Sequence, residues 1–471
     1  MKNKEKAAAG AAGALLPAVF SLAWPTMLEQ AVQTAVQYVD TAMVGSLGTR
    51  ATAAVGATAT VNWLVMGTVA ALGVGFLSYI ARALGAGERD RARRASAQSV
   101  LAVLAVGLAF TALTLGLSGR IPVWMQVDPA AQALAARYFF ILYLPMLPRT
   151  ASVVFGTVLR AAGDSKTPMR VGVRVNLLNV VLNFLLIYEP RRVSLFGLSL
   201  PLWGAGLGVT GAAAASALAF LYGGAAITAA LCRHPLVSPL GHSLRPDAGV
   251  LRPCLLVAVP NMLQRFATSL GYVVFAAMIN ALGELSTAAH TIANTVESAF
   301  YIPGYGMQSA AATLTGNALG AGDRARMRDQ GRVIVRLEVA MMLVSGALLF
   351  AFAPQLVGLF SRDAAVVRLG AAVLRMVACS EPFYGVSIVL EGMLQGAGST
   401  RMPFVFNVAG MWGVRILGTL VCTQALGLGL VSAWGCMIAH NLLLFAAFVV
   451  YYRSGKWNPL RLRNSECGIR N

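Results

Sequence analysis

The chain has 471 residues, of which 57% are hydrophobic and 12% are charged, whereas soluble domains carry about 25% charged residues. This composition argues against a soluble enzyme. The formal net charge is +19, but the basic residues lie in short loops between apolar segments. Such a pattern is typical of cytoplasmic loops beside an anionic membrane surface, so we expect a lipid bilayer and no nucleic acid as the partner.

The N-terminal residues 1–15 carry Lys2, Lys4 and Lys6 before an Ala-rich stretch that merges with a long apolar segment. That segment is too long for the apolar core of a signal peptide, so we interpret residues 1–15 as an uncleaved cytoplasmic tail. The six cysteines form no CxxC motif and have no histidine at metal-ligand spacing. We therefore expect no zinc site, no disulfide framework and no cofactor.

Twelve apolar segments are bounded by Gly, Pro and charged residues, and about 20 residues suffice to cross a bilayer. They cover residues 16–44, 52–80, 96–118, 135–160, 170–188, 206–231, 252–281, 288–314, 331–353, 368–393, 403–424 and 429–451. If the N-terminus is inside, the cytoplasmic loops hold most of the Lys and Arg residues. This distribution predicts a multi-pass protein of the inner (plasma) membrane with both termini cytoplasmic.

The two halves of the chain repeat each other at a constant offset of 235 residues. The matches are Pro25–Leu28 with Pro260–Leu263, Ala83–Arg89 with Ala318–Arg324, and Gly163 and Pro168 with Gly398 and Pro403. The offset falls to 221 where Gly206–Gly208 matches Gly427–Gly429. The first half therefore carries a 14-residue insertion, which we interpret as an outer hairpin around residues 189–192.

Each repeat contains six predicted helices, an even number, so the two copies have the same orientation in the membrane. The fold class is thus an all-α polytopic membrane protein with twelve helices in two six-helix lobes, related by a parallel internal repeat. The predicted organisation is an N-lobe (16–231), a cytoplasmic linker (232–251), a C-lobe (252–451) and a cytoplasmic tail (452–471). The ligand cavity is expected between the lobes.

The motif set resembles the multidrug and toxic compound extrusion (MATE) family of secondary transporters over about residues 15–452. The motifs are Val39–Gly45, Leu84–Gly87 with its copy Leu319–Gly322, Leu159–Pro168, Ala288–His290 with Val296–Ser298, and Met411–Arg415. The resemblance implies two lobes arranged in a V, alternating access, and export of cationic or amphipathic compounds against a proton or sodium gradient. There is no GxxxxGK[ST] motif to bind nucleotide phosphates.

The first helix carries a polar stripe at membrane depth, formed by Glu29, Gln33, Gln37 and Asp40. Glu29 and Asp40 are eleven residues apart and point in nearly the same direction, because each residue of an α-helix turns by 100°. Ionisable side chains inside a membrane usually line a cavity or pair with each other. A desolvated carboxylate can take up a proton and release it when water enters, so the stripe predicts a coupling site.

The resemblance implies that Asp40 carries the coupling ion, since the aspartate of this motif is tied to coupling in MATE proteins. It also implies that Asn179 and Asn183 of the fifth helix are partners of Asp40 in the cavity, with Ser216 near a polar family position. Asn183 departs from the aspartate of proton-coupled archaeal relatives, which weakens a mechanism with two carboxylates in the N-lobe. The alternative role for these amides is hydrogen bonding between helices.

The second lobe does not duplicate the stripe, because the repeat equivalents of Asp40 and Glu29 are Phe275 and Gln264. Sodium-coupled relatives use a glutamate and an aspartate at positions where this chain has Gln264 and Tyr384. Glu381, three residues before Tyr384, is a candidate replacement.

Two further candidates lie on the eighth predicted helix. Glu297 is a possible cavity or coupling residue, and His290 lies seven residues earlier on the same face. A histidine beside a carboxylate would titrate near neutral pH.

Five other charged residues at membrane depth receive structural roles. We expect Arg149, Arg265 and Arg415 to neutralise buried carboxylates, and we expect Arg160 and Glu391 to extend toward the membrane surface from helix ends.

The sequence thus predicts a monomeric antiporter that exports organic cations in exchange for protons. Sodium coupling is the first alternative. Flipping of a lipid-linked precursor is the second, and Arg149, Arg174 and Arg265 suit its diphosphate. A membrane-embedded enzyme is the last alternative. It would need catalytic His, Asp or Cys residues clustered at the membrane interface, whereas the loops of this chain offer only His234 and His242.

Overall fold

The computed structural model describes residues 2–195 and 198–460, and this part of the chain is almost entirely helical. The first half contains α1 (Lys2–Gly45), α2 (Thr49–Gly85), α3 (Arg89–Leu117), the short α4 (Ile121–Trp124), α5 (Pro129–Tyr143), α6 (Met146–Ala161), α7 (Lys166–Leu186), strands β1 (Arg191–Leu195) and β2 (Leu198–Leu202), and α8 (Gly208–Arg233). The predicted tail residues 2–15 continue α1, and the C-terminal residues 461–471 lie outside the described residues.

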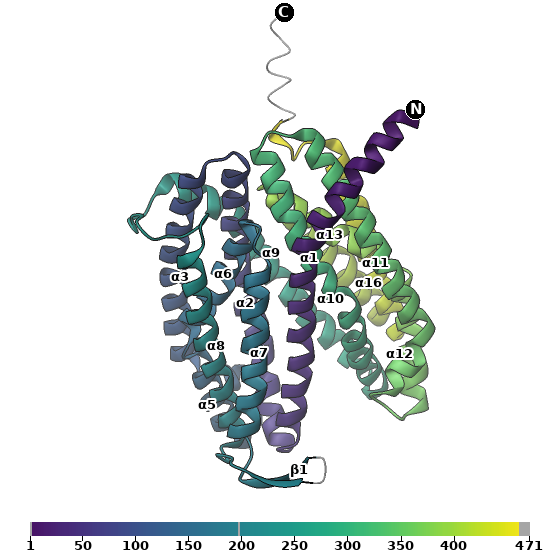
Figure 1. The fold of residues 1–471 in the computed structure, drawn as a ribbon. Coiled ribbons are helices and arrows are strands. Elements are labelled where there is room, and N and C mark those ends of the chain that lie inside the picture. Colours follow the sequence, from purple (N-terminus) through teal and green to yellow (C-terminus); the bar gives the residue numbers. More distant parts are fainter. Residues whose placement is uncertain (1, 196–197, 461–471) are drawn as a thin grey trace, which may run out of the picture.

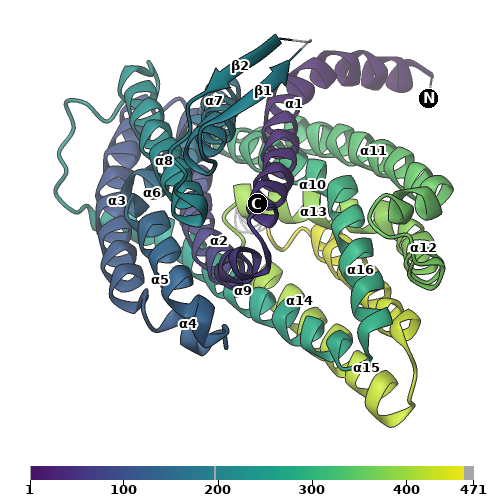
Figure 2. The same ribbon diagram turned by 90° about the horizontal axis from the view of Figure 1, so that it is seen from below.

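The second half repeats this order without the strands. It contains α9 (Ala248–Asn280), α10 (Glu284–Gly320), α11 (Arg324–Gly358), α12 (Ala364–Ala378), α13 (Glu381–Gly396), α14 (Arg401–Ala409), the π-helix η1 (Gly410–Ile416), α15 (Leu417–Leu420), the π-helix η2 (Val421–Ala425) and α16 (Leu430–Ser454). Figure 1 shows the two halves as two bundles that lean apart toward the end bearing the β-hairpin, and Figure 2 views them from that end.

The membrane-crossing segments follow the predicted ones, with two bends. Eight described helices are long and apolar enough to cross a membrane, or ten segments if each of two bent helix pairs is one span. The long helices α1 and α10 complete a twelve-span fold, and both carry polar side chains near their middle.

The bends were not predicted. They lie between α5 and α6 (50°) and between α12 and α13 (54°), where Pro145 and Pro382 interrupt the regular backbone hydrogen bonding.

The internal repeat is confirmed by the backbone. The two bends are 235 residues apart, and glycines with positive φ recur at the same offset: Gly48 and Gly283, Gly87 and Gly322, Gly163 and Gly398. The predicted insertion is the antiparallel hairpin β1–β2, in which Arg191 pairs with Leu202. We refer to this end of the molecule as the hairpin end, and to the opposite end, where α1 begins and α16 finishes, as the termini end.

The lobes meet at the termini end through α2 and α10, which approach each other with almost no side chain between them. A Cβ atom on Gly85 would collide with the Asn317 carbonyl, and one on Gly320 would collide with the Arg82 carbonyl. These two contacts are equivalent under the 235-residue repeat. Glycine is therefore required at both positions because the two backbones leave no room for a Cβ atom, and not because of an unusual φ angle.

Two hydrogen bonds between the lobes have donors that are related by the same repeat. The Ser78 hydroxyl of α2 donates to the Gly396 carbonyl at 3.0 Å, and the Thr313 hydroxyl of α10 donates to the Arg160 carbonyl at 3.2 Å. Ser78 and Thr313 are repeat equivalents, and both are buried. The closed termini end is thus stabilised by two hydroxyl donors at equivalent positions, one from each lobe.

The linker between the lobes lies against α3 of the N-lobe. Gln98 donates to the Arg245 carbonyl at 2.8 Å and accepts from the Asp247 amide at 3.1 Å, while Arg93 donates to the Pro235 carbonyl at 2.7 Å. Asp247 then caps α9 by accepting from the Gly249 amide. The first turn of the C-lobe is consequently fixed to the N-lobe.

We expect Gly85→Ala to lower the free energy of unfolding by about 1–3 kcal/mol, because the added methyl group forces α2 and α10 apart. The measurement is the thermal unfolding midpoint of the purified protein in detergent. Gly116→Ala is the matched control, since no atom lies within 4 Å of its Cβ position. Equal midpoints for the two variants would contradict the proposed role of the close approach.

Candidate functional site

The polar stripe of α1 is present, and its two ends have different environments. Gln33 and Gln37 are exposed, as is Thr41 one turn later. On α10, which packs against α1, Thr291 and Asn294 are exposed too. Polar side chains are thus exposed on two helices that pack against each other.

Asp40 accepts hydrogen bonds from two asparagines of α7. Asn183 Nδ2 donates to Asp40 Oδ1 at 2.6 Å. When Asn179 is turned so that its Nδ2 faces Asp40, this nitrogen lies 3.0 and 2.9 Å from the two carboxylate oxygens and 3.2 Å from Asn183 Nδ2, while Asn179 Oδ1 accepts from Ser216 Oγ at 3.0 Å. The structure brings Asp40, Asn179, Asn183 and Ser216 together, and we call this group the Asp40 cage.

The α1 helix that carries Asp40 also touches the other lobe. The Tyr38 hydroxyl donates to the Thr295 carbonyl of α10 at 3.2 Å, and Met27 packs where a Cβ on Gly306 would lie. The Asp40 cage therefore lies on a helix that contacts both lobes. A change in the hydration or charge of the cage can reach the contact between the lobes through this one helix.

Glu29, at the other end of the stripe, forms an ion pair with Arg160 of α6, with Nη2 2.6 Å from Oε2. The expectation that Arg160 extends toward the membrane surface is wrong, because its guanidinium turns inward to this carboxylate. Gly172 of α7 leaves room for the pair, since a Cβ there would lie 3.0 Å from Glu29 Oε1. Both partners are mostly buried, with side chains 19% and 16% exposed.

The C-lobe replaces this ion pair with a network of amides. The repeat equivalents of Glu29 and Arg160 are Gln264 and Gln395, and both donate to Glu391 Oε1, at 2.8 and 3.0 Å. Asn407 donates to the other oxygen of Glu391 at 3.4 Å. Glu391 is buried, so the expectation that it extends toward the membrane surface is also wrong.

Glu391 borders a small, partly open cavity of about 80 Å³ inside the C-lobe. The lining is polar and aromatic and includes Gln264, Arg265, Tyr272, Tyr305, Tyr384 and His440. Tyr384 lines this cavity inside the C-lobe, and its hydroxyl lies 3.3 Å from that of Tyr305. The volume is sufficient for a few water molecules or one small ion.

His290 and Glu297 occupy different surroundings. Trp434 Nε1 donates to His290 Nδ1 at 3.2 Å, and the Phe275 ring lies edge-on to the imidazole at 5.6 Å. Glu297 is buried one helical turn before Tyr301. No hydrogen bond joins His290 to Glu297 among the described residues, so the structure does not support the predicted histidine–carboxylate pair.

Two buried carboxyl groups of the C-lobe have no hydrogen-bond partner within the described part of the chain. They belong to Glu381, at the start of α13, and Glu338, in the middle of α11. Their exposed fractions are 1% and 0%. Sequence analysis missed Glu338, although a lone glutamate within an apolar helix is a signal that could have identified it. An ionised carboxylate without donors is costly to bury, so both groups fit their surroundings in the neutral form.

The buried arginines stack on aromatic rings instead of neutralising carboxylates. The Arg415 guanidinium lies 4.2 Å from the Phe275 ring centre, and that of Arg149 lies 4.3 Å from the Phe220 ring centre. Arg149 also donates to Asn62 Oδ1 at 2.7 Å. Among residues 2–195 and 198–460, no ion pair involves Arg149, Arg265 or Arg415, so the predicted neutralisation is wrong as a direct contact.

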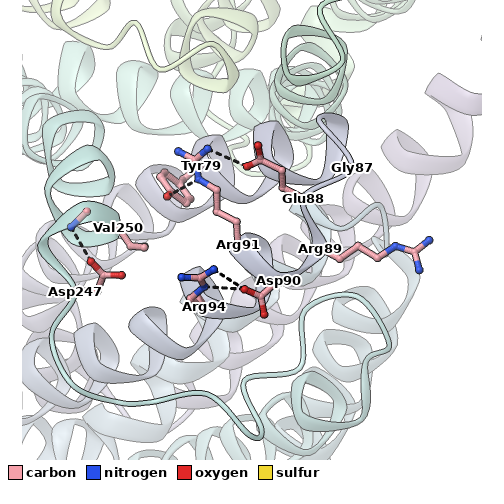
Figure 3. A pocket seen from close by; sticks show the side chains of 10 residues that line it. Tyr79, Gly87, Glu88, Arg89, Asp90, Arg91, Arg94, Asp247 and Val250 are labelled. Atoms are coloured by element: carbon pink, nitrogen blue, oxygen red, sulfur yellow. Dashed lines mark hydrogen bonds and ion pairs between the residues drawn. The ribbon is translucent and has the colours of Figure 1, made fainter.

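A larger open pocket of about 710 Å³ lies at the termini end, between the α2–α3 turn and the start of α9 (Figure 3). Its charged side chains pair locally: Arg91 with Glu88 at 2.9 Å and Arg94 with Asp90 at 2.6 Å. These exposed pairs lie outside the intramembrane sites. In the described residues no group of three or more His, Cys, Asp or Glu side chains is arranged to hold a metal ion.

Comparison with known proteins places the whole chain in one group. The MatE family model matches residues 25–185 and 260–421, one copy in each lobe. A probable multidrug resistance protein NorM of Thermotoga maritima is 27% identical over 93% of this chain and 92% of its own length. Its namesake in Bradyrhizobium diazoefficiens is 30% identical over 88% of both chains.

Two solved structures have the same fold. A transporter of the MOP superfamily from Pyrococcus furiosus superposes with a TM-score of 0.85, at 23% identity, over 95% of this chain and 97% of its own. A structure described as the outward-facing conformation of a multidrug resistance MATE family transporter superposes with a TM-score of 0.86, also at 23% identity and with the same coverage.

We expect Glu29→Gln to destabilise the protein by about 1–3 kcal/mol, because it leaves the Arg160 guanidinium buried without its counter-charge. The free energy of unfolding in a mild denaturant series measures this. Glu88→Gln is the matched control, since the Glu88–Arg91 pair is about half exposed and such pairs contribute about 0–1 kcal/mol. If both substitutions have the same effect, the buried pair has no special role.

Proposed function

Since this chain belongs to the MatE family of multidrug efflux transporters, we propose that it exports cationic or amphipathic small molecules in exchange for inward-moving protons. The proposed exchange for protons rests on one observation, the Asp40 cage. It holds a half-buried carboxylate on α1, the helix that contacts both lobes. We assign Asp40 as the proton carrier, with Asn179 and Asn183 as its positioning residues.

The chemistry of the cage supports a proton in preference to sodium. With Asn179 turned as described, the amide N–H groups of Asn179 and Asn183 face Asp40, and an N–H donor stabilises a carboxylate without ligating a cation. When water leaves the region, the carboxylate loses solvation and favours its protonated form. When water returns, the amides can again stabilise the ionised form. The cage thereby exchanges a proton as its access to water alternates.

The C-lobe gives weaker support for a sodium site. The positions that carry carboxylates in sodium-coupled relatives are Gln264 and Tyr384 here, and the cavity beside them also contains the permanently charged Arg265. A fixed cation opposes binding of a second one. Glu297 and Glu381 remain the candidate coupling residues of this lobe in the alternative, sodium-driven mechanism.

The substrate class follows from the polar and charged groups at membrane depth. Asp40, the exposed glutamines Gln33 and Gln37 and the exposed Tyr38 ring lie on α1, facing the region open to the hairpin end. An anionic group near aromatic surface favours amphipathic cations. We further propose that the termini end is cytoplasmic, following the distribution of Lys and Arg, and that the protein acts as a monomer containing both repeats.

We expect Asp40→Asn to fold normally and to lose proton-driven export, because an amide cannot carry the proton. The measurement is efflux of ethidium from proteoliposomes under an imposed proton gradient, with binding of ethidium measured separately. Asp128→Asn is the matched control: Asp128 is an exposed cap of α5, and asparagine caps helices equally well. Proton-driven efflux retained by Asp40→Asn would overturn the assignment.

The same vesicles test the alternative ion. With a sodium gradient and no proton gradient, we expect no efflux by the wild-type protein. Sodium-driven efflux that is lost in Glu381→Gln or Glu297→Gln would move the coupling site to the C-lobe. Absence of efflux under either gradient would instead favour transport of a lipid-linked precursor.

A further inference from the structure

Two cysteine thiols meet near the hairpin end of the C-lobe. Cys422 lies in η2, and Cys436 lies at the end of the second turn of α16. Their sulfur atoms are 3.8 Å apart, and both residues are partly exposed. Neither residue belongs to the Asp40 cage or to the C-lobe cavity, so the proposed transport function leaves this pair without a role.

The surrounding structure holds the thiols in place. Cys436 occupies the notch above Gly418, where a Cβ would lie 3.1 Å from the Cys436 sulfur. The carbonyl of Cys422 accepts from the Leu428 amide at 2.9 Å, so the short turn into α16 folds back onto η2. Two residues before Cys436, Trp434 donates to His290 of α10 and anchors α16. Because these contacts already fix η2 and α16, little further conformational freedom has to be lost to bring the two sulfur atoms together.

The remaining separation is small. A disulfide bond is about 2.05 Å long, so the sulfurs need to approach by about 1.8 Å. Rotation of the two side chains and a slight shift of the π-helical turn can supply this. Segments of π-helix are wider than α-helix and are frequent at functional sites.

We propose that Cys422 and Cys436 form a redox-active pair that becomes a disulfide on the outer side of the membrane. The location rests on the proposed orientation, in which the hairpin end is outside, where disulfides persist. The oxidant is an external disulfide compound, RSSR. One cysteine thiolate attacks RSSR, releases RS⁻ and forms a mixed disulfide, and the second thiolate then displaces the remaining RS⁻. Two electrons pass from the cysteine sulfurs to RSSR, and the two thiol protons end on two RSH molecules.

The bond would join the last two membrane-crossing segments of the C-lobe. It would connect η2 to α16 close to the contact between Trp434 and His290. We therefore expect the oxidised protein to unfold at a higher temperature than the reduced protein. The difference in midpoint should disappear in both Cys422→Ser and Cys436→Ser.

The pairing is tested on the purified full-length protein in detergent, where sidedness has no influence. The protein is incubated with oxidised glutathione, alkylated with N-ethylmaleimide, reduced, and alkylated with a heavier maleimide before mass spectrometry. We expect the peptides of Cys422 and Cys436 to carry the heavy label together. In Cys422→Ser the reaction should stop at the mixed disulfide, so before reduction Cys436 should carry a glutathione adduct that the wild-type pair lacks. Cys379→Ser, which changes an exposed cysteine elsewhere, is the matched control and should leave the pair unchanged.

Sidedness is tested in spheroplasts with oxidised glutathione, which does not cross the membrane. Leu359→Cys reports the orientation, because Leu359 is 78% exposed in the α11–α12 turn at the hairpin end. Light label on both cysteines in detergent would overturn the proposed pair. If the pair forms in detergent but not in spheroplasts, and the thiol of Leu359→Cys does not react with oxidised glutathione in spheroplasts, the proposed orientation is overturned instead. If the thiol of Leu359→Cys does react and the pair still does not form in spheroplasts, the proposed outer redox role is wrong.

Discussion

The close approach of α2 and α10 at the termini end is the constraint on which the two-lobe arrangement depends. Gly85 and Gly320 let each helix backbone touch the other, and the hydroxyl groups of Ser78 and Thr313 bind carbonyls across the same boundary. Because the repeat relates these contacts, each lobe supplies the same donor and the same small residue to its neighbour. The lobes can lean apart at the hairpin end only while this double contact holds the other end together.

The chemistry of the two lobes differs although their backbones repeat. In the N-lobe, the pair of Glu29 and Arg160 combines opposite charges, whereas the equivalent glutamines of the C-lobe are neutral and bind Glu391. The equivalent of Asp40 is the ring of Phe275, which packs against Arg415. The repeated backbone therefore carries a partly exposed carboxyl group, that of Asp40, in the N-lobe and buried glutamates in the C-lobe. This asymmetry gives the protein two chemically distinct places at which a transported ion could act.

Much of the fold could be predicted from the sequence, because apolar segment length and the 235-residue offset are properties of the chain alone. The bends at Pro145 and Pro382 could not, since the apolar pattern continues through them. The association of Asn179 and Asn183 with Asp40 was expected from the family resemblance, since spacing along a helix does not tell which other helix faces it. The inward turn of Arg160 could not, because spacing does not tell which neighbouring helix a long side chain meets. Glu338 was missed although a single glutamate in an apolar helix marks it, and only the fold shows that its carboxyl group is buried without a hydrogen-bond partner among the described residues.

The attachment of the linker to α3 restricts how the lobes can move. Gln98 binds both the Arg245 carbonyl and the Asp247 amide, immediately before α9 begins. A linker held by these hydrogen bonds keeps the start of α9 at a fixed position on α3. The C-lobe can turn about the start of α9, but it cannot be drawn away from α3 at that point without first breaking these bonds. Any separation of the lobes at the termini end therefore has to leave the start of α9 in place against α3.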